Sequence, residues 1–196
     1  MSSRPAPRPT LLLASASPRR RELLRALGLE PIVRPAEVDE SLRPGEDPHA
    51  AAERLARAKA TAAAAEAPAG ALVLAADTIV VLDGEALGKP RDDEDARRML
   101  RALRGRAHDV VTGVALARDG RLVSGRETTE VLFAAMTDEE VDAYVASGEP
   151  ADKAGAYALQ GLGGLFVERI TGTPSNVIGL PFRLVRSLGA QLGFRI

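Results

Sequence analysis

Apolar segments of strand length alternate with well-capped helical segments through the first half of this chain, and that order limits the possible folds. Thr10–Ala14 has the length and composition of a buried strand, and a helix is predicted directly after it over Pro18–Leu27. A second strand is expected within Glu30–Pro35. A long alanine-rich helix is predicted over residues 47–67, because Asp and then Pro are favourable residues at a helix start. This alternation favours an α/β fold.

Hairpins take the place of crossover helices later in the chain. Asp83-Gly84 and Asp119-Gly120 are dipeptides of the kind that closes two-residue hairpins. The strands expected around them are Ala71–Ala76, Thr78–Leu82, Asp109–Ala117 and Leu122–Phe133. The other elements expected are a helix from Asp92 or Asp93 to Arg104, a helix from Thr137 to Ser147, a Gly-rich loop over Asp152–Gly164, a strand over Leu165–Ile170, a loop over Thr171–Asn176 and a helix opened by Pro181. Together these elements predict a mixed β-sheet flanked by helices.

The length and composition bound the domain organisation and the partners. A chain of 196 residues is long enough for one domain with a substantial core, and we predict a single α/β domain over residues 10–196 after a flexible N-terminal tail, residues 1–9. The net charge of −1 predicts no stable binding to nucleic acid or to an anionic membrane. The absence of cysteine excludes disulfides and thiol nucleophiles. Without a signal-peptide or membrane-spanning pattern, we expect a cytoplasmic protein.

The start of the first helix carries two adjacent arginines. Ser17 is the expected N-cap and Pro18 the first helical residue, so that Arg19 and Arg20 lie in the first turn. Positive charges at this end oppose the helix dipole and cost a little stability, which favours a function for them. Unpaired backbone N–H groups and guanidinium groups would meet there, and we predict phosphate binding at Ser17 and Arg20. A first turn with solvated arginines is the structural alternative.

Asp77 is the strongest catalytic candidate. It is a single carboxylate between the apolar runs Val73–Ala76 and Thr78–Leu82, where a charged residue is otherwise costly. It could orient a water molecule as a general base or bind a divalent cation near phosphates, and the sequence does not separate these roles. The structural alternative is an aspartate at a strand end that caps a turn or pairs with a lysine.

Two lysines become candidates for phosphate binding only if the fold brings them close to the arginines of the first helix. Lys59 lies in the alanine-rich helix, and Lys89 follows the first hairpin. Each alone is typical of a solvated surface, but together with the arginines of the first helix they would suit a triphosphate, and we predict them to bind phosphate. The acidic loop 37–40 could hold a divalent metal cation, Mg²⁺ or Mn²⁺, through Asp39 and Glu40, although a charged loop is more often simply hydrated.

A Gly-rich segment, Asp152–Gly164, is the third candidate region. Its glycines permit close approach of a ligand to the main chain, and Gln160 has both a donor and an acceptor with which to contact a base. Tyr157 could stack on a ligand or fill the core. The spacing fits neither a phosphate-binding P-loop nor the dinucleotide fingerprint, so that a Gly-rich turn between strands is the alternative.

Several familiar chemistries are excluded. His49 and His108 are the only histidines, and neither lies in a zinc-ligand pattern or beside a Gly-x-Ser-x-Gly motif. We expect His49 to be exposed and His108 to be structural. The six aromatic residues Phe and Tyr are too few for a stacking platform that binds single-stranded nucleic acid.

Taken together, these segments resemble the Maf family of nucleoside triphosphate pyrophosphatases over nearly the full chain. Seven motifs occur in the family's order, and their combination is specific. They are Ala-Ser-Ala-Ser-Pro-Arg-Arg at 14–20, Glu-Val-Asp-Glu at 37–40, Lys59 in Leu-Ala-Arg-Ala-Lys-Ala, Ala-Ala-Asp-Thr at 75–78, Gly-Lys-Pro at 88–90, Asp-Lys-Ala-Gly-Ala-Tyr-Ala-Leu-Gln-Gly at 152–161 and Ser-Asn-Val-Ile-Gly-Leu-Pro at 175–181.

The resemblance implies both a fold and an activity. The implied fold is an elongated, Maf/ITPase-like α/β structure with two lobes and a cleft between them, usually as a homodimer. The implied reaction is hydrolysis of a nucleoside triphosphate to the monophosphate and pyrophosphate with a divalent cation, which removes unwanted nucleotides. Asp77 matches the family's proton acceptor, and Arg19, Thr78 and Gln160 fall where the family sets substrate choice. The stretch ending in Gln160 is similar to the branch that acts on dTTP and UTP.

One departure and one alternative function stand beside this interpretation. Asn176 and its neighbours follow Thr-Pro where the family has a more polar or aromatic loop, which leaves the wall beside the base undefined. The alternative is a regulator of cell division or septum formation that binds nucleotide without turnover. A pure binding protein could dispense with Asp77, so a complete set of charged site residues favours the enzyme.

Overall fold

The computed structural model describes residues 9–196, and it is built on one mixed sheet of seven strands. The strand order is β2-β1-β3-β5-β6-β7, and β4 pairs with β3. The tail predicted over residues 1–9 lies, except for Pro9, outside the described residues. The strands are β1 (Leu11–Leu13), β2 (Ile32–Val33), β3 (Leu72–Leu82), β4 (Glu85–Leu87), β5 (Ala107–Arg118), β6 (Arg121–Phe133) and β7 (Val167–Thr171). The predicted α/β fold with a mixed, helix-flanked sheet is therefore confirmed.

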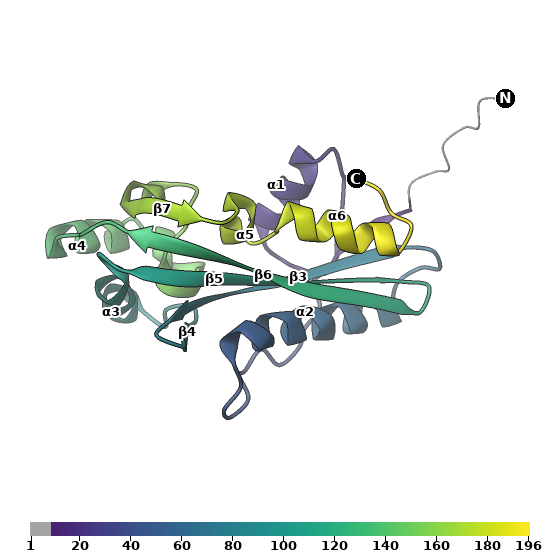
Figure 1. Cartoon of the computed structure of the whole chain (residues 1–196), viewed down its shortest axis with the longest axis horizontal. Helices are drawn as coiled ribbons and strands as arrows, with labels where there is room; N and C mark the ends of the chain where they lie inside the picture. The colour runs from purple at the N-terminus through teal and green to yellow at the C-terminus, as the bar shows by residue number, and fades with distance from the viewer. Residues whose placement is uncertain (1–8) are drawn as a thin grey trace.

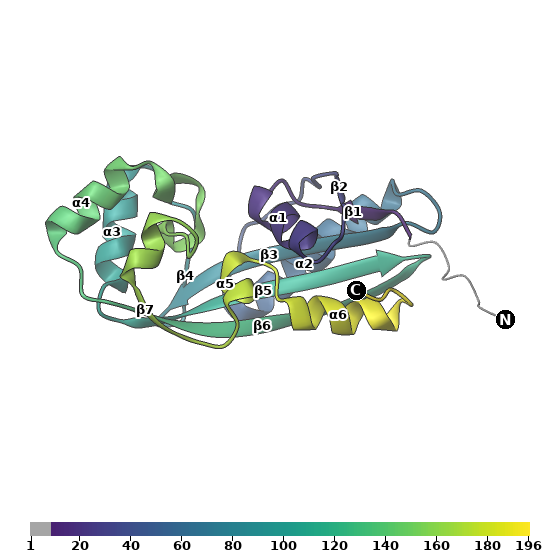
Figure 2. The same ribbon diagram turned by 90° about the horizontal axis from the view of Figure 1, so that it is seen from above.

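Three long antiparallel strands, β3, β5 and β6, run through the length of the molecule (Figures 1 and 2). The hairpin between β5 and β6 turns at Asp119 and Gly120, which both adopt positive φ, at 48° and 75°. Asp and Gly tolerate this conformation better than other residues, which is why this dipeptide predicted the turn. The two runs predicted around Asp77 form one continuous strand, β3.

Helices cover both faces of the sheet. They are α1 (Pro18–Ala26), α2 (Pro48–Ala65), α3 (Asp93–Leu103), α4 (Asp138–Ala146), α5 (Pro174–Ile178) and α6 (Phe182–Gln191). Helix α2 packs on one face, and α1 and α6 pack on the other, as Figure 1 shows. Side chains alternate along β3 accordingly: Val73 contacts the α2 layer, whereas Leu72 and Leu74 contact the α1 and α6 layer.

Helix α2 lies unusually close to the sheet at Gly113. A Cβ atom added to this glycine of β5 would lie 2.2 Å from the backbone oxygen of Ala52. The residues that α2 turns toward the sheet are correspondingly small, since Ala52 and Ala56 are both 0% exposed. Gly113 is also the register partner of Asp77 on β3, so the close approach occurs beside the catalytic candidate.

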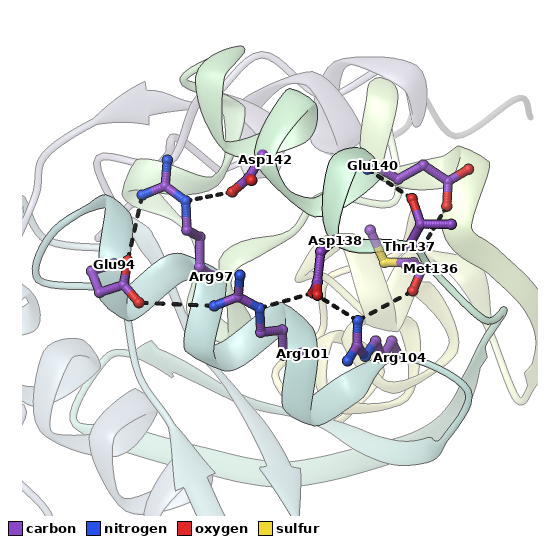
Figure 3. Close-up of polar contacts among 9 residues, drawn as sticks. All are labelled: Glu94, Arg97, Arg101, Arg104, Met136, Thr137, Asp138, Glu140 and Asp142. Carbon is purple, nitrogen blue, oxygen red and sulfur yellow. Dashed lines mark hydrogen bonds and ion pairs between the residues drawn. The ribbon is translucent and has the colours of Figure 1, made fainter.

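Helices α3 and α4 form a separate group at one end of the sheet, seen at the left of Figure 2. Their apolar side chains share a core cluster with the ends of β3, β5 and β6, including Leu100, Phe133 and Val141. An exposed set of ion pairs joins the two helices along their length (Figure 3). Arg97 contacts Asp142 at 2.7 Å, and Asp138 accepts from Arg101 at 3.1 Å and from Arg104 at 2.9 Å. Water screens exposed pairs of this kind, so the buried cluster provides most of the stability.

The edge of β3 that faces β1 is paired only in part. Strand β1 pairs with β3 up to Leu74, and β4 begins to pair at Val80. Within the described residues, 9–196, no strand pairs with this edge between those two points. Asp77 and Thr78 lie in this interval, where this backbone edge of β3 has no described strand beside it.

The capping residues in the sequence predicted most of the helix ends correctly, but the short helix α5 was not predicted. Asp47 accepts a hydrogen bond from the backbone N–H of His49 at the start of α2, and Thr137 and Glu140 form the predicted capping box of α4. The predicted loop Thr171–Asn176 was wrong in its second half, because α5 begins at Pro174. Short 3-10 segments at 149–152, 154–156 and 162–166 occupy the Gly-rich region. Within residues 9–196, no helix has the length and apolarity to cross a membrane.

Candidate active site

A cavity of about 630 Å³ opens at the unpaired edge of β3. Its walls come from α1, α2 and β3, from the segment after β4, and from the Gly-rich segment. Most of the residues singled out from the sequence line it. They are Ser17, Arg19, Arg20, Glu40, Lys59, Asp77, Thr78, Lys89 and Gln160. The fold thus brings together side chains that are widely separated in the sequence.

Lys59 and Asp77 form the buried ion pair at the base of the cavity. The Nζ of Lys59 donates to Oδ1 of Asp77 at 2.6 Å and lies 2.5 Å from Oε1 of Glu40. The side chains of Lys59 and Asp77 are only 10% and 12% exposed, whereas that of Glu40 is 56% exposed. Helix α2 supplies the lysine from the face toward which Asp77 points. The lysine partner foreseen as the structural alternative for Asp77 is therefore present within the proposed catalytic site.

The two carboxylates predicted as metal ligands lie in different surroundings. Partial burial raises the pKa of Glu40, but the hydrogen bond and charge of Lys59 and the charges of Lys89 and Arg20 outweigh it, so that this pKa lies below its ordinary value. Asp39 does not line the cavity, and its carboxylate accepts instead from the backbone N–H of Ser41 at 2.9 Å and from the Ser41 hydroxyl.

Arg20 is held by the protein on three sides. Its Nε donates to the carbonyl oxygen of Gly179 at 2.9 Å, Nη1 donates to Oγ of Ser15 at 2.9 Å, and Nη2 donates to Oγ1 of Thr78 at 3.0 Å. The residue is 9% exposed, and burial lowers its pKa while the charge of Asp77 raises it. Because a guanidinium group has five N–H donors, two remain for a ligand.

Arg19, Ser17 and Lys89 border the more open part of the cavity. Ser17 occupies the N-cap position of α1 as predicted, but its side chain makes no capping hydrogen bond. Arg19 is half-buried and Lys89 is exposed. The four cations predicted from the sequence are thus of two kinds: Arg20 and Lys59 are buried and bound by protein acceptors, whereas Arg19 and Lys89 lie nearer to solvent.

The Gly-rich segment forms one wall of the cavity, the Gly-rich wall, and the carboxylate of Glu149 accepts several hydrogen bonds from groups in and beside it. Oε1 of Glu149 accepts from the Tyr144 hydroxyl at 2.8 Å and from the N–H of Gly163 at 2.9 Å, and Oε2 accepts from the N–H of Leu162 at 3.0 Å. The Tyr144 oxygen also accepts from the N–H of Ala158 at 3.2 Å. Burial raises the pKa of Glu149, but these donors outweigh it and lower the pKa below its ordinary value. Gln160, which is exposed, lies in the segment that they hold.

Tyr157 and His108 form a buried pair behind this wall. Nε2 of His108 lies 2.8 Å from the Tyr157 hydroxyl, and both residues pack edge-on against Phe133. Tyr157 is 6% exposed and belongs to a core cluster, as one of its two predicted roles requires, and it also lines the cavity. Burial lowers the pKa of His108 to about 4, and the negative charge of Asp109 opposes this shift.

His49 was expected to be exposed, and this prediction was wrong. Its side chain is 28% exposed and lies between two carboxylates, with Nδ1 at 3.2 Å from Asp47 and Nε2 at 3.1 Å from Asp109. It therefore ties the start of α2 to β5.

Sequence reasoning missed several groups of the site. Ser15 lies in the same motif as the arginines but was not singled out, and Glu149 precedes Pro150 at a short turn that carries no chemical signal. Thr112 looks like any β-branched strand residue. The partners of Thr112, and Leu162 and Gly163 as partners of Glu149, lie far away in the chain, so local patterns do not reveal these contacts, whereas Ser15 contacts the nearby Arg20.

Comparison with known proteins identifies relatives over the whole described fold. The profile of the Maf-like protein family matches residues 10–192. A dTTP/UTP pyrophosphatase of Anaeromyxobacter dehalogenans (strain 2CP-C) is 55% identical over 95% of both chains. A dTTP/UTP pyrophosphatase of Chromobacterium violaceum is 50% identical over 95% of this chain and 96% of the relative.

Solved structures of lower identity share the fold. A HAM1 protein from Coxiella burnetii is 19% identical with a TM-score of 0.51, over 94% of this chain and 98% of that one. The Staphylococcus aureus Ham1 protein is 17% identical with a TM-score of 0.50, over 93% of this chain and 95% of that one. The family profile spans the strands, α1, α2 and the Gly-rich wall that together form the cavity. This chain belongs to the Maf-like protein family.

Proposed function

We propose that this protein is a nucleoside triphosphate pyrophosphatase, a hydrolase of acid anhydrides that converts dTTP and UTP to the monophosphate and pyrophosphate. The observation that carries the proposal is the buried Asp77–Lys59 pair at the base of a cavity bordered by Arg19, Arg20 and Lys89. The relatives named dTTP/UTP pyrophosphatase, which are about as long as this chain, support the choice of substrates. Modified pyrimidine triphosphates are further candidates for removal from the nucleotide pool.

The proposed reaction begins with a water molecule beside Asp77. The carboxylate accepts a proton from this water as its oxygen attacks the α-phosphorus. The bond from the α-phosphorus to the bridging oxygen breaks, and pyrophosphate leaves with the electron pair. Lys59 holds Asp77 in place at 2.6 Å and leaves one N–H of its ammonium group for a substrate oxygen, since Asp77 and Glu40 take the other two.

The cationic groups divide the remaining tasks. Arg19 and Lys89, which lie nearer to solvent, attract and hold the phosphates, and the two remaining N–H groups of Arg20 add hydrogen bonds at depth. The unpaired N–H groups at the start of α1, where Ser17 is the N-cap, lie on the same side. Arg19, Thr78 and Gln160 are proposed to set substrate choice, because they line the cavity from three different elements.

The carboxylates fit a divalent cation that arrives with the nucleotide. Among the described residues, no group of three or more His, Cys, Asp or Glu side chains could hold a metal ion. Glu40 and Asp77 each contact the ammonium group of Lys59 through one oxygen, which leaves the second oxygen of each carboxylate, and Mg²⁺ is commonly bound by one or two carboxylates together with substrate phosphates. The oxygens of Glu40 and Asp77 that do not contact Lys59 would therefore hold it, whereas Asp39 accepts from Ser41. When bound, Mg²⁺ or Mn²⁺ neutralises charge on the leaving pyrophosphate.

Product identification tests the proposed function. The purified protein is incubated with each common triphosphate and with Mg²⁺ or Mn²⁺, and we expect pyrophosphate and monophosphate from dTTP and UTP. Inorganic phosphate as the first product would indicate cleavage at the γ-phosphorus and would contradict the proposal. Nucleotide binding without turnover would favour the regulator of cell division.

Asp77 has a direct test. Loss of a general base lowers rates by about 10²- to 10⁴-fold, so we expect a fall of this size in kcat for Asp77→Asn. The control is Asp83→Asn, since Asp83 lies in the exposed turn after the same strand and Asn also tolerates its positive φ of 53°. Unchanged pyrophosphate release by Asp77→Asn would remove Asp77 from this role.

Assembly and location complete the proposal. We propose a homodimer in the cytoplasm, in line with the family resemblance, and light scattering of the purified protein measures the oligomeric state.

A further inference from the structure

A line of hydrogen bonds runs from the cavity wall into the core. Thr112 of β5 is 0% exposed and is the register partner of Thr78 on β3. Its Oγ1 lies 3.0 Å from Oγ1 of Thr78 and 3.0 Å from the backbone oxygen of Asn176. Thr78 Oγ1 in turn lies 3.0 Å from Nη2 of Arg20. Arg20, Thr78, Thr112 and Asn176 thus form one continuous chain of contacts.

The available protons fix the direction of every bond in this chain. A guanidinium nitrogen only donates, a carbonyl oxygen only accepts, and each threonine hydroxyl has a single proton. The three contacts have three donor groups between them, which are the guanidinium of Arg20 and the hydroxyls of the two threonines. Only one assignment of the protons gives each contact a hydrogen bond. In that assignment Arg20 donates to Thr78, Thr78 donates to Thr112, and Thr112 donates to the Asn176 carbonyl. The reverse bond, from Thr112 to Thr78, would leave two oxygens 3.0 Å apart without a proton between them.

The direction of this chain determines what Thr78 offers to the cavity. Thr78 lines the cavity and is half-buried, but its proton points inward to Thr112. Only a lone pair of its hydroxyl oxygen remains for a ligand. A phosphate oxygen, which only accepts, gains no hydrogen bond there, whereas an N–H or O–H group does.

We propose that Thr112 is a positioning residue that holds Thr78 as a hydrogen-bond acceptor, and that the nucleotide places a donor against Thr78. The inference rests on the proposed function, in which Thr78 contributes to substrate choice. The imide N–H of uracil and thymine is such a donor, whereas the same ring nitrogen in cytosine only accepts. A sugar hydroxyl is the other source of a donor on the nucleotide.

Paired variants of Thr112 test the inference. Thr112→Val keeps the shape of the side chain but removes the acceptor, so that Thr78 can turn its proton toward the cavity. Thr112→Ser keeps the hydroxyl and serves as the conservative control. Both are compared with the unmodified protein by kcat and KM on UTP, CTP and 3′-deoxy-UTP, and by melting temperature.

The valine variant is expected to lose substrate preference. The ratio of kcat/KM for UTP to that for one competitor should fall by about three- to tenfold, the effect of one neutral hydrogen bond, and serine should restore it. A loss of preference against CTP assigns the donor to the base, and a loss against 3′-deoxy-UTP assigns it to the sugar. Unchanged ratios in Thr112→Val, or equal changes in both variants, overturn the inference and leave Thr112 a structural residue.

Two further measurements apply if the valine variant does not fold or if the unmodified protein has no pyrophosphatase activity. If Thr112→Val does not fold, the unmodified protein is compared on UTP, N3-methyl-UTP and 3′-deoxy-UTP, and equal KM values for all three overturn the inference. If the unmodified protein releases no pyrophosphate from any triphosphate, the proposed function fails. Dissociation constants for the same nucleotides then replace the kinetic ratios, so that failure of the function and failure of the inference are told apart.

Discussion

Arg20 and Lys59 carry full positive charges, yet the protein itself supplies most of their hydrogen-bond acceptors. Arg20 donates to Ser15, Thr78 and Gly179, and Lys59 lies between two carboxylates. The sequence predicted both residues as phosphate ligands, because residue type and helix position reveal charge but not partners. Their placement in the cavity was foreseen through the motifs, whereas the division between buried and solvent-facing cations required the tertiary contacts.

His108 gives the molecule a sensitivity to acid that does not involve the reaction. Its pKa is lowered by burial to about 4, below the value near 6.5 for the unfolded chain. As the pH falls, the unfolded chain therefore binds the proton first. The contribution of the neutral His108 to the free energy of unfolding is therefore complete above about pH 6.5 and is lost progressively as the pH falls toward 4. The difference between the pKa of His108 in the unfolded chain and in the folded protein corresponds to roughly 3 kcal/mol of stability.

We predict that replacement of His108 flattens this dependence. The free energy of unfolding is measured with urea at several pH values between 7 and 4 for the unmodified protein and for His108→Gln, which keeps a polar group beside Tyr157. The difference between the two proteins should change by up to about 3 kcal/mol over this range, in favour of the variant at low pH. Parallel curves would show that His108 is not the titrating group.

At the scale of elements, the Gly-rich wall depends on one side chain of a neighbouring turn. Glu149 receives the N–H groups of Leu162 and Gly163 and the hydroxyl of Tyr144. The glycines leave room for it, since a Cβ atom at Gly161 would lie 2.3 Å from Oε2 of Glu149. The segment that contains Gln160 thus takes its shape from a carboxylate outside the segment.

We predict that Glu149→Gln weakens nucleotide binding more than catalysis. The amide group brings N–H donors toward backbone N–H donors, and an unsatisfied contact of this kind costs about 1–3 kcal/mol. KM for UTP should rise roughly tenfold while kcat changes little, and the amide protons of Leu162 and Gly163 should exchange faster. Glu139→Gln, at an exposed position of α4, is the matched control. Exchange rates that stay the same at both amides would count against this role.

Short sequence patterns predict most of the helices and strands, but they predict few of the hydrogen bonds within the candidate site. The turn at Asp119-Gly120 and the capping box at Thr137 were predictable because short stretches of sequence determine them. Helix α5 was missed, since five residues are too few for a hydrophobic period. The partners of Glu149 and Thr112 were not predictable either, because they depend on register and on segments that meet only after folding.

At the scale of the whole molecule, one close contact between backbones relates the fold to the site. Helix α2 crosses β5 at Gly113, beside Asp77, and the same helix provides Lys59. The spacing between helix and sheet therefore also sets how far Lys59 reaches toward Asp77. A change in that spacing would affect stability and chemistry together.

We predict that Gly113→Ala impairs both properties. Its Cβ would lie 2.2 Å from the Ala52 carbonyl oxygen and 2.3 Å from the carbonyl carbon, so that α2 must move outward. Overpacking of this kind costs about 1–3 kcal/mol, and displacement of Lys59 should lower kcat as well. Gly125→Ala on β6 is the control, because its Cβ would meet only the flexible side chain of Leu184, at 3.0 Å. Equal melting temperatures and kcat values for the two variants would refute the coupling.

The same contact changes how the alanine-rich helix should be regarded. Its composition looks like bias in the coding sequence, and nothing in it draws attention beyond Lys59. Yet Ala51, Ala52 and Ala56 are completely buried, and the carbonyl group of Ala52 makes the close approach to Gly113. We therefore expect larger side chains at these three positions to destabilise the protein, whereas the exposed Ala62 and Ala65 of the same helix should tolerate them. Within this helix, the tolerance to substitution is thus expected to depend on how closely each residue approaches the sheet rather than on amino-acid type.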